Sequence, residues 1–273
     1  MADRKPKIGV ALGAGSARGW AHIGVLQELA KAGIRPDIIC GTSIGSLVGA
    51  VYADDRVAAL EEWVGALTWR KVVGYFDLTL RGGLLKGDRL FEELQGDFLG
   101  KHIEELGRPF AAVASDLATG REIWLREGPV AEAVRASIAM PGLFTPKARD
   151  GQLLVDGALV NPVPVTPARA IGADFVIAVD LSSSIVGQFM RARDQDPPKV
   201  PNLAEVIVGS LNIMSVRITR SRMAGEPADA VIQPRLGALG LLEYHRGKEA
   251  IAEGREAAEL AIPQIRRALQ DWS

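Results

Sequence analysis

The sequence predicts an α/β fold in which helices pack against a largely parallel sheet. Short apolar and β-branched runs alternate with helical patterns along the chain, as in consecutive βαβ units. Two of the connections from a strand to a helix are rich in glycine. Hydrophobic residues make up 48% of the 273 residues and charged residues 24%, the balance of an ordinary globular protein. We therefore expect one domain spanning residues 1–273.

The N-terminal part contains two strand–loop–helix units. The expected ranges are 7–12 for a buried strand, 13–19 for a glycine loop, 20–32 for a helix that ends at Gly33, 37–40 for a second strand and 46–53 for a helix of small residues. Residues 56–105 have an irregular helical pattern interrupted by glycines, and we expect them to form a cap or lid.

The rest of the chain continues the alternation. We expect strands at 110–114, 122–125, 152–155, 174–180 and 230–233, and helices at 130–137, 164–171, from 203 and from 246 onward. The strand at 152–155 follows an Asp150-Gly151 turn. Residues 183–201 are polar and contain Pro197-Pro198, which indicates a mobile loop.

Composition excludes several classes of protein. Lys and Arg total 32 against 33 Asp and Glu, so the net charge of −1 argues against a general nucleic-acid binder. One cysteine excludes a disulfide framework, and three histidines leave little material for a metal centre. No apolar run is long enough to span a bilayer, and the N-terminal apolar stretch fits a first strand better than a signal peptide. We expect a cytoplasmic protein.

The strongest local motif is Gly41-Thr42-Ser43-Ile44-Gly45. This G-x-S-x-G pattern lies directly between an expected strand and an expected helix, which is the context of a nucleophile elbow. The flanking glycines allow close chain packing while the serine takes a strained conformation. A glycine-flanked helix start capped by serine is the simpler alternative.

The glycine loop at 13–19 also joins a strand to a helix, so its backbone N–H groups are suited to binding an anion. One interpretation is a nucleotide phosphate cradle, but Arg18 stands where the dinucleotide motif needs its third glycine, and no Walker A motif occurs. The other is an oxyanion hole. The proximity of a second glycine-rich turn favours the oxyanion hole.

The third signal is Asp156, at the end of a short apolar strand and followed by Gly157. A carboxylate there can act as the base that a serine nucleophile requires, which is attractive in a chain with so few histidines. A simple Asp-Gly turn is the alternative.

Together these motifs resemble the bacterial branch of the patatin-like phospholipases. The resemblance rests on GAGSARG with AHIGVL, GTSIG, DGA followed by Asn161-Pro162, and Arg135-Ala136-Ser137 with Met140-Pro141-Gly142, in the family's order from residue 8 to about 180. It implies a three-layer α/β/α sandwich and a Ser–Asp dyad without histidine. By this match Ser43 is the nucleophile and Asp156 the base, and no metal or organic cofactor is needed.

The resemblance also assigns the glycine loop as the oxyanion hole, formed by Gly13, Ala14, Gly15 and Ser16 and mainly by the N–H groups of the last two. Ala14 and Ser16 stand where the family usually has glycine. Arg18 matches the family's basic residue, which is expected to brace the loop or meet a phosphate. The supporting glycines are expected to be Gly19, Gly41, Gly45 and Gly157.

A Ser43…Asp156…His245 triad, in the chain order of α/β-hydrolases, is a competing interpretation. We expect His245 to be solvated or to cap a helix, His22 to pack under the glycine loop, and His102 to lie on the surface. Cys40 is expected to be buried. Asp116, Asp174 and Asp180 are strand-end carboxylates suited to orienting loops.

These observations predict a serine acyl hydrolase acting on a lipid or another ester, with a noncatalytic lipid- or nucleotide-binding module as the alternative. Residues 69–91 mix aromatic, leucine and basic side chains, and Arg217, Arg220 and Arg222 form a second basic patch. Either patch suits transient peripheral contact with an anionic membrane surface. An ordinary cap packed on the core is the alternative for 69–91. The sequence leaves the oligomeric state open.

Overall fold

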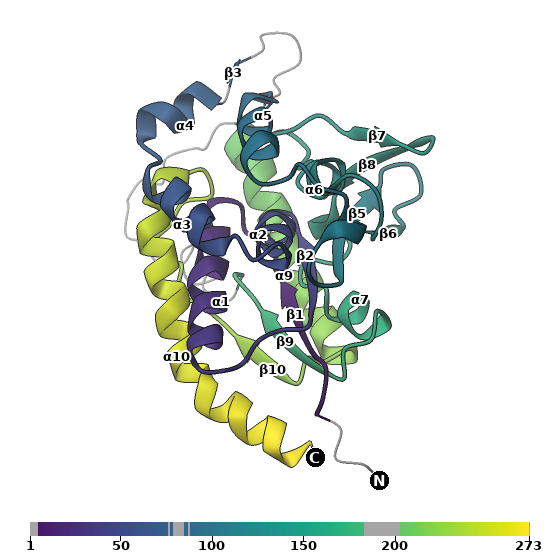
Figure 1. Cartoon of the computed structure of the whole chain (residues 1–273). Coiled ribbons are helices and arrows are strands. Elements are labelled where there is room, and N and C mark those ends of the chain that lie inside the picture. The colour runs from purple at the N-terminus through teal and green to yellow at the C-terminus, as the bar shows by residue number, and fades with distance from the viewer. Residues whose placement is uncertain (1–4, 76, 79–84, 87, 183–202, 273) are drawn as a thin grey trace, which may run out of the picture.

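The computed structural model describes residues 5–75, 77–78, 85–86, 88–182 and 203–272. Its centre is an eight-stranded sheet with helices on both faces (Figure 1). The strands β10, β9, β1, β2 and β5 are neighbours in that order, and every pair among them is parallel. The mainly parallel sheet is confirmed.

The strands of this sheet are β1 (Ile8–Leu12), β2 (Ile38–Thr42), β5 (Phe110–Asp116), β6 (Glu122–Leu125), β7 (Lys147–Arg149), β8 (Gln152–Asp156), β9 (Phe175–Val179) and β10 (Ala230–Ile232). A separate two-stranded ribbon consists of β3 (Asp77–Leu78) and β4 (Leu85–Lys86).

The α-helices are α1 (Ala21–Lys31), α2 (Ile44–Ala53), α3 (Val57–Gly65), α4 (Trp69–Tyr75), α5 (Asp88–Asp97), α6 (Val130–Ser137), α7 (Val165–Ala170), α9 (Leu203–Gly225) and α10 (Gly247–Asp271). Short 3₁₀ helices are η1 (Ser16–Trp20), η2 (Ile103–Glu105), η3 (Gly157–Leu159) and η5 (Tyr244–Arg246). The range 183–201, expected to be a mobile loop, lies outside the described residues.

The three layers follow from the alternation of side chains along each strand. In β1, Val10 and Leu12 join the larger core beneath α1, α2 and α10, whereas Ala11 joins the smaller core beneath α7. Figure 1 shows α1 and α10 side by side on one face and α7 on the other. The expected α/β/α sandwich is confirmed.

The direction of three strands was not foreseen from the sequence. β6 and β8 both pair antiparallel with β5, and β7 forms an antiparallel hairpin with β8. The hairpin turn is Asp150-Gly151, where both residues have positive φ (50° and 76°), as a two-residue hairpin loop requires. Apolar runs reveal strands but not their direction, because side chains alternate equally in either direction.

The pairing of strands with β5 determines where the candidate site lies. β2 and β8 must lie on the same edge of β5, because β6 occupies the other edge over the same residues. Thr42, the last residue of β2, pairs with Val113, and Asp156, the last residue of β8, pairs with the next residue, Ala114. The two strands therefore meet end to end.

In the part of the chain that the structure describes, no helix is both long and apolar enough to cross a membrane.

Candidate active site

Ser43 lies in the turn between β2 and α2. The backbone of this turn packs closely on itself and on the end of β1. Its φ and ψ angles are 57° and −128°, a region that a residue with a side chain rarely adopts. A Cβ atom on Gly41 would lie 2.3 Å from the carbonyl oxygen of Gly45, and one on Gly45 would lie 2.2 Å from that of Leu12. The predicted elbow geometry is confirmed, with both glycines required by close approach.

Ser43 and Asp156 form a direct hydrogen-bonded pair. The Ser43 hydroxyl donates to Oδ2 of Asp156 at 2.6 Å, and Oδ1 of Asp156 accepts the N–H of Ala158 at 2.8 Å. Both members of the pair are buried, with 5% and 1% of their surface exposed. Burial raises the pKa of Asp156 from its ordinary value of 3.8 to about 6, while the two hydrogen bonds act in the opposite direction. Such a carboxylate is suited to accepting a proton near neutral pH.

Neighbouring hydroxyl groups fix both members of this pair. The N–H of Ser43 donates to Oγ of Ser137 at 2.9 Å, and Ser137 in turn donates to the carbonyl of Val113 at 2.6 Å. On the other side, Ser115 donates to the carbonyl of Asp156 at 2.8 Å. No role was predicted for Ser137, although it lies in the Arg135-Ala136-Ser137 motif.

The glycine loop differs from the expectation in two of its four proposed donors. The N–H of Gly13 donates to Val179 and that of Ala14 to Pro162, at 3.0 and 2.9 Å. These two N–H groups already bond to β9 and to the bend at Pro162, so their assignment as oxyanion donors is wrong. Among the described residues, the N–H groups of Gly15 and Ser16 have no protein acceptor within hydrogen-bonding distance. Because two of its four backbone N–H groups already donate to other parts of the protein, the loop is also poorly suited to binding a phosphate.

Gly15 and Ser16 open the helical segment formed by η1 and α1, where backbone N–H groups lack intrahelical partners. Ser16 has a φ of 51°, so a side chain occupies a left-handed position that favours glycine. A Cβ atom on Gly15 would lie 2.6 Å from Leu181. Of the two residues whose N–H groups have no acceptor among the described residues, Gly15 is a glycine and Ser16 is not. Ser16 nevertheless adopts the left-handed conformation that favours glycine.

The other supporting residues brace this arrangement. Arg18 is 3% exposed and donates through Nε to the carbonyl of Leu239 at 2.8 Å, which fits its expected bracing role. A Cβ on Gly19 would clash with Ile44 at 2.1 Å, and one on Gly157 with the Val113 carbonyl at 2.2 Å.

The histidines lie elsewhere. His22 is fully buried beneath the loop, with Nε2 2.7 Å from the carbonyl of Gly13, and burial lowers its pKa to about 4. His102 is exposed. In the described ranges, neither Ser43 nor Asp156 hydrogen-bonds to a histidine, and Tyr244 rather than His245 lines the cavity beside them.

The strand-end carboxylates orient local backbone, as expected. Asp116 accepts the N–H of Ala118, Asp174 that of Lys7, and Asp180 that of Ser182, each at 2.8 Å. Cys40 is buried in β2, as expected.

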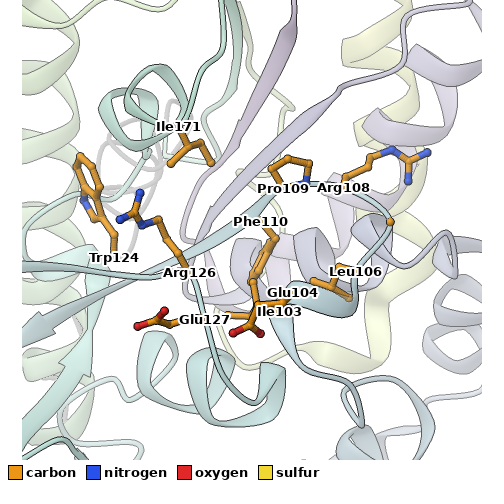
Figure 2. Close-up of a pocket in the computed structure, with 11 residues that line it drawn as sticks. Ile103, Glu104, Leu106, Arg108, Pro109, Phe110, Trp124, Arg126, Glu127 and Ile171 are labelled. Carbon is orange, nitrogen blue, oxygen red and sulfur yellow. The ribbon is translucent and has the colours of Figure 1, made fainter.

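Two small cavities, of about 40 and 30 Å³, flank the pair. The first is mainly apolar, with Leu94, Leu143 and Phe144 among its lining residues. A larger surface hollow of about 590 Å³ lies at the opposite end of β5, around Phe110, where Arg126 stands between Trp124 and Ile171 (Figure 2). That hollow is remote from Ser43, because Phe110 begins the strand whose far half contacts Asp156.

Sequence comparison relates the chain to one protein family. The sequence model of the patatin-like phospholipase family matches residues 10–169. An NTE family protein of Mycobacterium tuberculosis is 37% identical, over 94% of this chain and 91% of the relative. The mouse patatin-like phospholipase domain-containing protein 6 is 34% identical over 73% of this chain and 16% of its own length.

Among solved structures, VipD from Legionella pneumophila aligns with a TM-score of 0.59 at 12% identity, over 96% of this chain and 67% of its own. At that identity the likeness shows the fold alone. The family match covers more than half of the chain and includes Ser43 and Asp156. The chain therefore belongs to the patatin-like phospholipase family.

Proposed function

We propose that this protein is a serine acyl hydrolase that cleaves lipid esters with a Ser43–Asp156 dyad. The observation that carries the proposal is the 2.6 Å hydrogen bond from the Ser43 hydroxyl to a buried carboxylate. A serine needs such a base to become nucleophilic. Membership of the family supports lipid hydrolysis as the general activity.

In the proposed first half-reaction, Asp156 accepts the hydroxyl proton as Oγ of Ser43 attacks the ester carbonyl carbon. The negative charge that develops on the carbonyl oxygen is stabilised by the N–H groups of Gly15 and Ser16. The C–O bond to the alcohol then breaks, and the alcohol leaves with the proton from Asp156. An acyl-enzyme remains on Ser43.

Water completes the cycle. Asp156 accepts a proton from water as its oxygen attacks the acyl carbon, and the same two N–H groups stabilise the second oxyanion. Collapse of this intermediate breaks the bond to Oγ, which takes back the proton. The products are a carboxylic acid and free Ser43, and no step needs a metal or organic cofactor.

We further propose that the substrate is presented by an anionic lipid surface near α4. Trp69 is 62% exposed there, and Arg70 and Lys71 beside it are exposed. Helix α4 packs against η5, which contains the cavity-lining Tyr244. Val72 and Phe91, in contrast, are buried, so part of this region packs on the core as a cap. The other basic residues of 69–91 lie among residues whose side chains are not described.

The second basic patch has two exposed cations rather than three. Arg217 and Arg220 are exposed on α9, whereas Arg222 pairs with Glu122 at 3.1 Å and Glu226 at 3.3 Å. We therefore treat α4 as the first candidate for membrane contact and α9 as the comparison.

The experiment that tests the proposed chemistry is covalent labelling with a fluorophosphonate, which reacts only with an activated serine. We expect wild-type protein to gain one label, located on Ser43 by peptide mass spectrometry, and to hydrolyse a short p-nitrophenyl ester. Ser43→Ala should lose both properties while remaining folded, as measured by circular dichroism, because it removes only one hydroxyl group. Ser210→Ala, at an exposed serine of α9, is the matched control. Turnover by purified Ser43→Ala would disprove the proposal.

A further inference from the structure

The loop that carries the proposed oxyanion donors is held by a segment more than 200 residues away in sequence. We call residues 239–244 the clamp segment. Three hydrogen bonds join the clamp segment to the loop: Ser16 Oγ with the Tyr244 hydroxyl at 2.7 Å, the Ala17 N–H with the Leu241 carbonyl at 3.0 Å, and Arg18 Nε with the Leu239 carbonyl at 2.8 Å. Three consecutive loop residues are therefore fixed from one side.

Ser16 is the residue that most needs such support. Its left-handed backbone conformation is unfavourable for a residue with a Cβ atom, so an external contact has to stabilise it. The bond to Tyr244 fixes the Ser16 side chain, and through it the direction of the adjoining N–H group. Ser16, Tyr244, Ser43 and Asp156 line the same cavity.

The clamp segment is itself well braced. Oε2 of Glu243 accepts the N–H of Gly240 and a guanidinium N–H of Arg246, both at 2.8 Å. The ring of Tyr244 packs edge to face on Trp20, with ring centroids 6.1 Å apart. The phenol keeps its proton near neutral pH, as any ordinary tyrosine does, and burial raises the pKa of Tyr244 further, to about 12. It is therefore a lasting hydrogen-bond partner for Ser16.

We propose that Tyr244 is a positioning residue for the oxyanion hole, acting through the Ser16 hydroxyl. This inference rests on the proposed acyl hydrolase function. It adds a C-terminal element, beyond the residues 10–169 that match the family, to the apparatus that stabilises the transition state. The contribution of Tyr244 should appear in kcat rather than in KM, because an oxyanion exists only in the transition state and intermediates.

A double-mutant cycle on the full-length protein tests this role. Tyr244→Phe should lower kcat for a short p-nitrophenyl ester about tenfold, below the 10²–10³-fold loss that follows outright removal of an oxyanion donor, with KM unchanged. In a Ser16→Ala background, the same Tyr244→Phe change should alter kcat by less than about twofold, because the proposed route through the Ser16 hydroxyl is gone. Tyr52→Phe, at a tyrosine with 8% exposure on another helix, is the matched control and should keep wild-type kcat.

Three outcomes would overturn the inference. Wild-type kcat in Tyr244→Phe would show that the hydroxyl positions nothing. An equal loss with and without the Ser16 hydroxyl would show that Tyr244 acts by another route. A loss accompanied by a matching fall in folded protein, measured by circular dichroism, would show a general structural role. Ser43→Ala, assayed alongside, separates the two proposals. Turnover by Ser43→Ala would disprove the proposed acyl hydrolase function itself. If Ser43→Ala is inactive, the three outcomes above bear only on the role of Tyr244.

Discussion

The N–H of Ser43 donates to the hydroxyl of Ser137, which places a buried side chain of α6 directly behind the proposed nucleophile. The same hydroxyl donates to Val113 on β5, so a single atom joins the elbow to the strand that also pairs with Asp156. The Ser137 hydroxyl therefore supports the strained backbone of Ser43, and removing this hydroxyl tests its role.

Ser137→Ala should reduce both stability and activity. It leaves the buried N–H of Ser43 without a partner, which costs about 1–3 kcal/mol of unfolding free energy. It also releases the backbone that aims the Ser43 hydroxyl, so kcat should fall in the protein that remains folded. Urea unfolding and ester turnover measure the two effects. Thr219→Val removes another buried hydroxyl, one that donates to Ser215 within α9, and should affect stability alone. Unchanged kcat in Ser137→Ala would contradict the supporting role.

Activity should follow the ionisation of Asp156. Only the carboxylate can accept the Ser43 proton, so kcat/KM for a short ester should rise as the pH passes through about 6 and level off above it. His22, whose pKa is lowered to about 4, should not contribute to this profile near neutral pH. The same profile in His22→Gln and His245→Gln would support the dyad, whereas complete loss of activity in folded His245→Gln would favour the triad.

Asp156→Asn should be inactive but more stable than the wild-type protein at neutral pH. A raised pKa means that the folded state binds the proton more tightly than the unfolded chain. The contribution of Asp156 to stability is therefore greatest below pH 3.8 and is lost as pH rises through about 6, by about 3 kcal/mol for the full shift. The amide carries no charge and avoids this loss. Urea unfolding above and below this range measures the difference, and a stability gap independent of pH would refute it.

Because the backbone of the elbow packs closely on β1, replacing Gly45 should strongly destabilise the protein. In Gly45→Ala the new Cβ would lie 2.2 Å from the Leu12 carbonyl, so the two segments must separate, at a cost of about 3 kcal/mol or more. Gly209→Ala in α9 meets nothing within 4 Å and should stabilise the protein by up to about 1 kcal/mol through helix propensity. Thermal unfolding of the two variants gives the comparison, and equal melting temperatures would show that the elbow tolerates the extra carbon.

The proposed lipid contact predicts a separation between two substrates. Replacing Arg70 and Lys71 with Gln should weaken binding to anionic vesicles roughly tenfold or more, at about 1 kcal/mol per basic residue, and the binding should fall with salt. Turnover of vesicle lipid should slow, whereas that of a soluble ester should not. Arg217→Gln/Arg220→Gln is the comparison at the other patch, and cosedimentation measures both. Equal losses on both substrates would identify α4 as a structural cap.

The sequence was informative where local chemistry decides the structure. Apolar runs ending in glycine marked β1 and β2, and the elbow motif led to a Ser43 conformation that only a tight turn explains. Two of the four expected oxyanion donors, Gly13 and Ala14, had to be discarded, because their N–H groups donate to Val179 and Pro162, far along the chain. No local pattern reveals such partners.

The position of Tyr244 beside the site and the antiparallel direction of β8 could not be predicted, for the same reason. Each depends on which segments lie side by side, which hydrophobic periodicity does not specify. His245 attracted attention through its chemistry, yet the residue before it is the one that lines the cavity.

The antiparallel pairing of β8 with β5 makes the position of the proposed catalytic carboxylate depend on strand register. Because side chains alternate along a strand, slipping β8 by one residue would turn Asp156 to the opposite face of the sheet and present an apolar or glycine neighbour to Ser43. The pairing of β8 with β5 fixes this register, because Asp156 lies opposite Ala114 and the Ser115 hydroxyl donates to the Asp156 carbonyl. On the proposed function, ester turnover reports strand alignment, and selection for activity also selects against misaligned forms of the sheet.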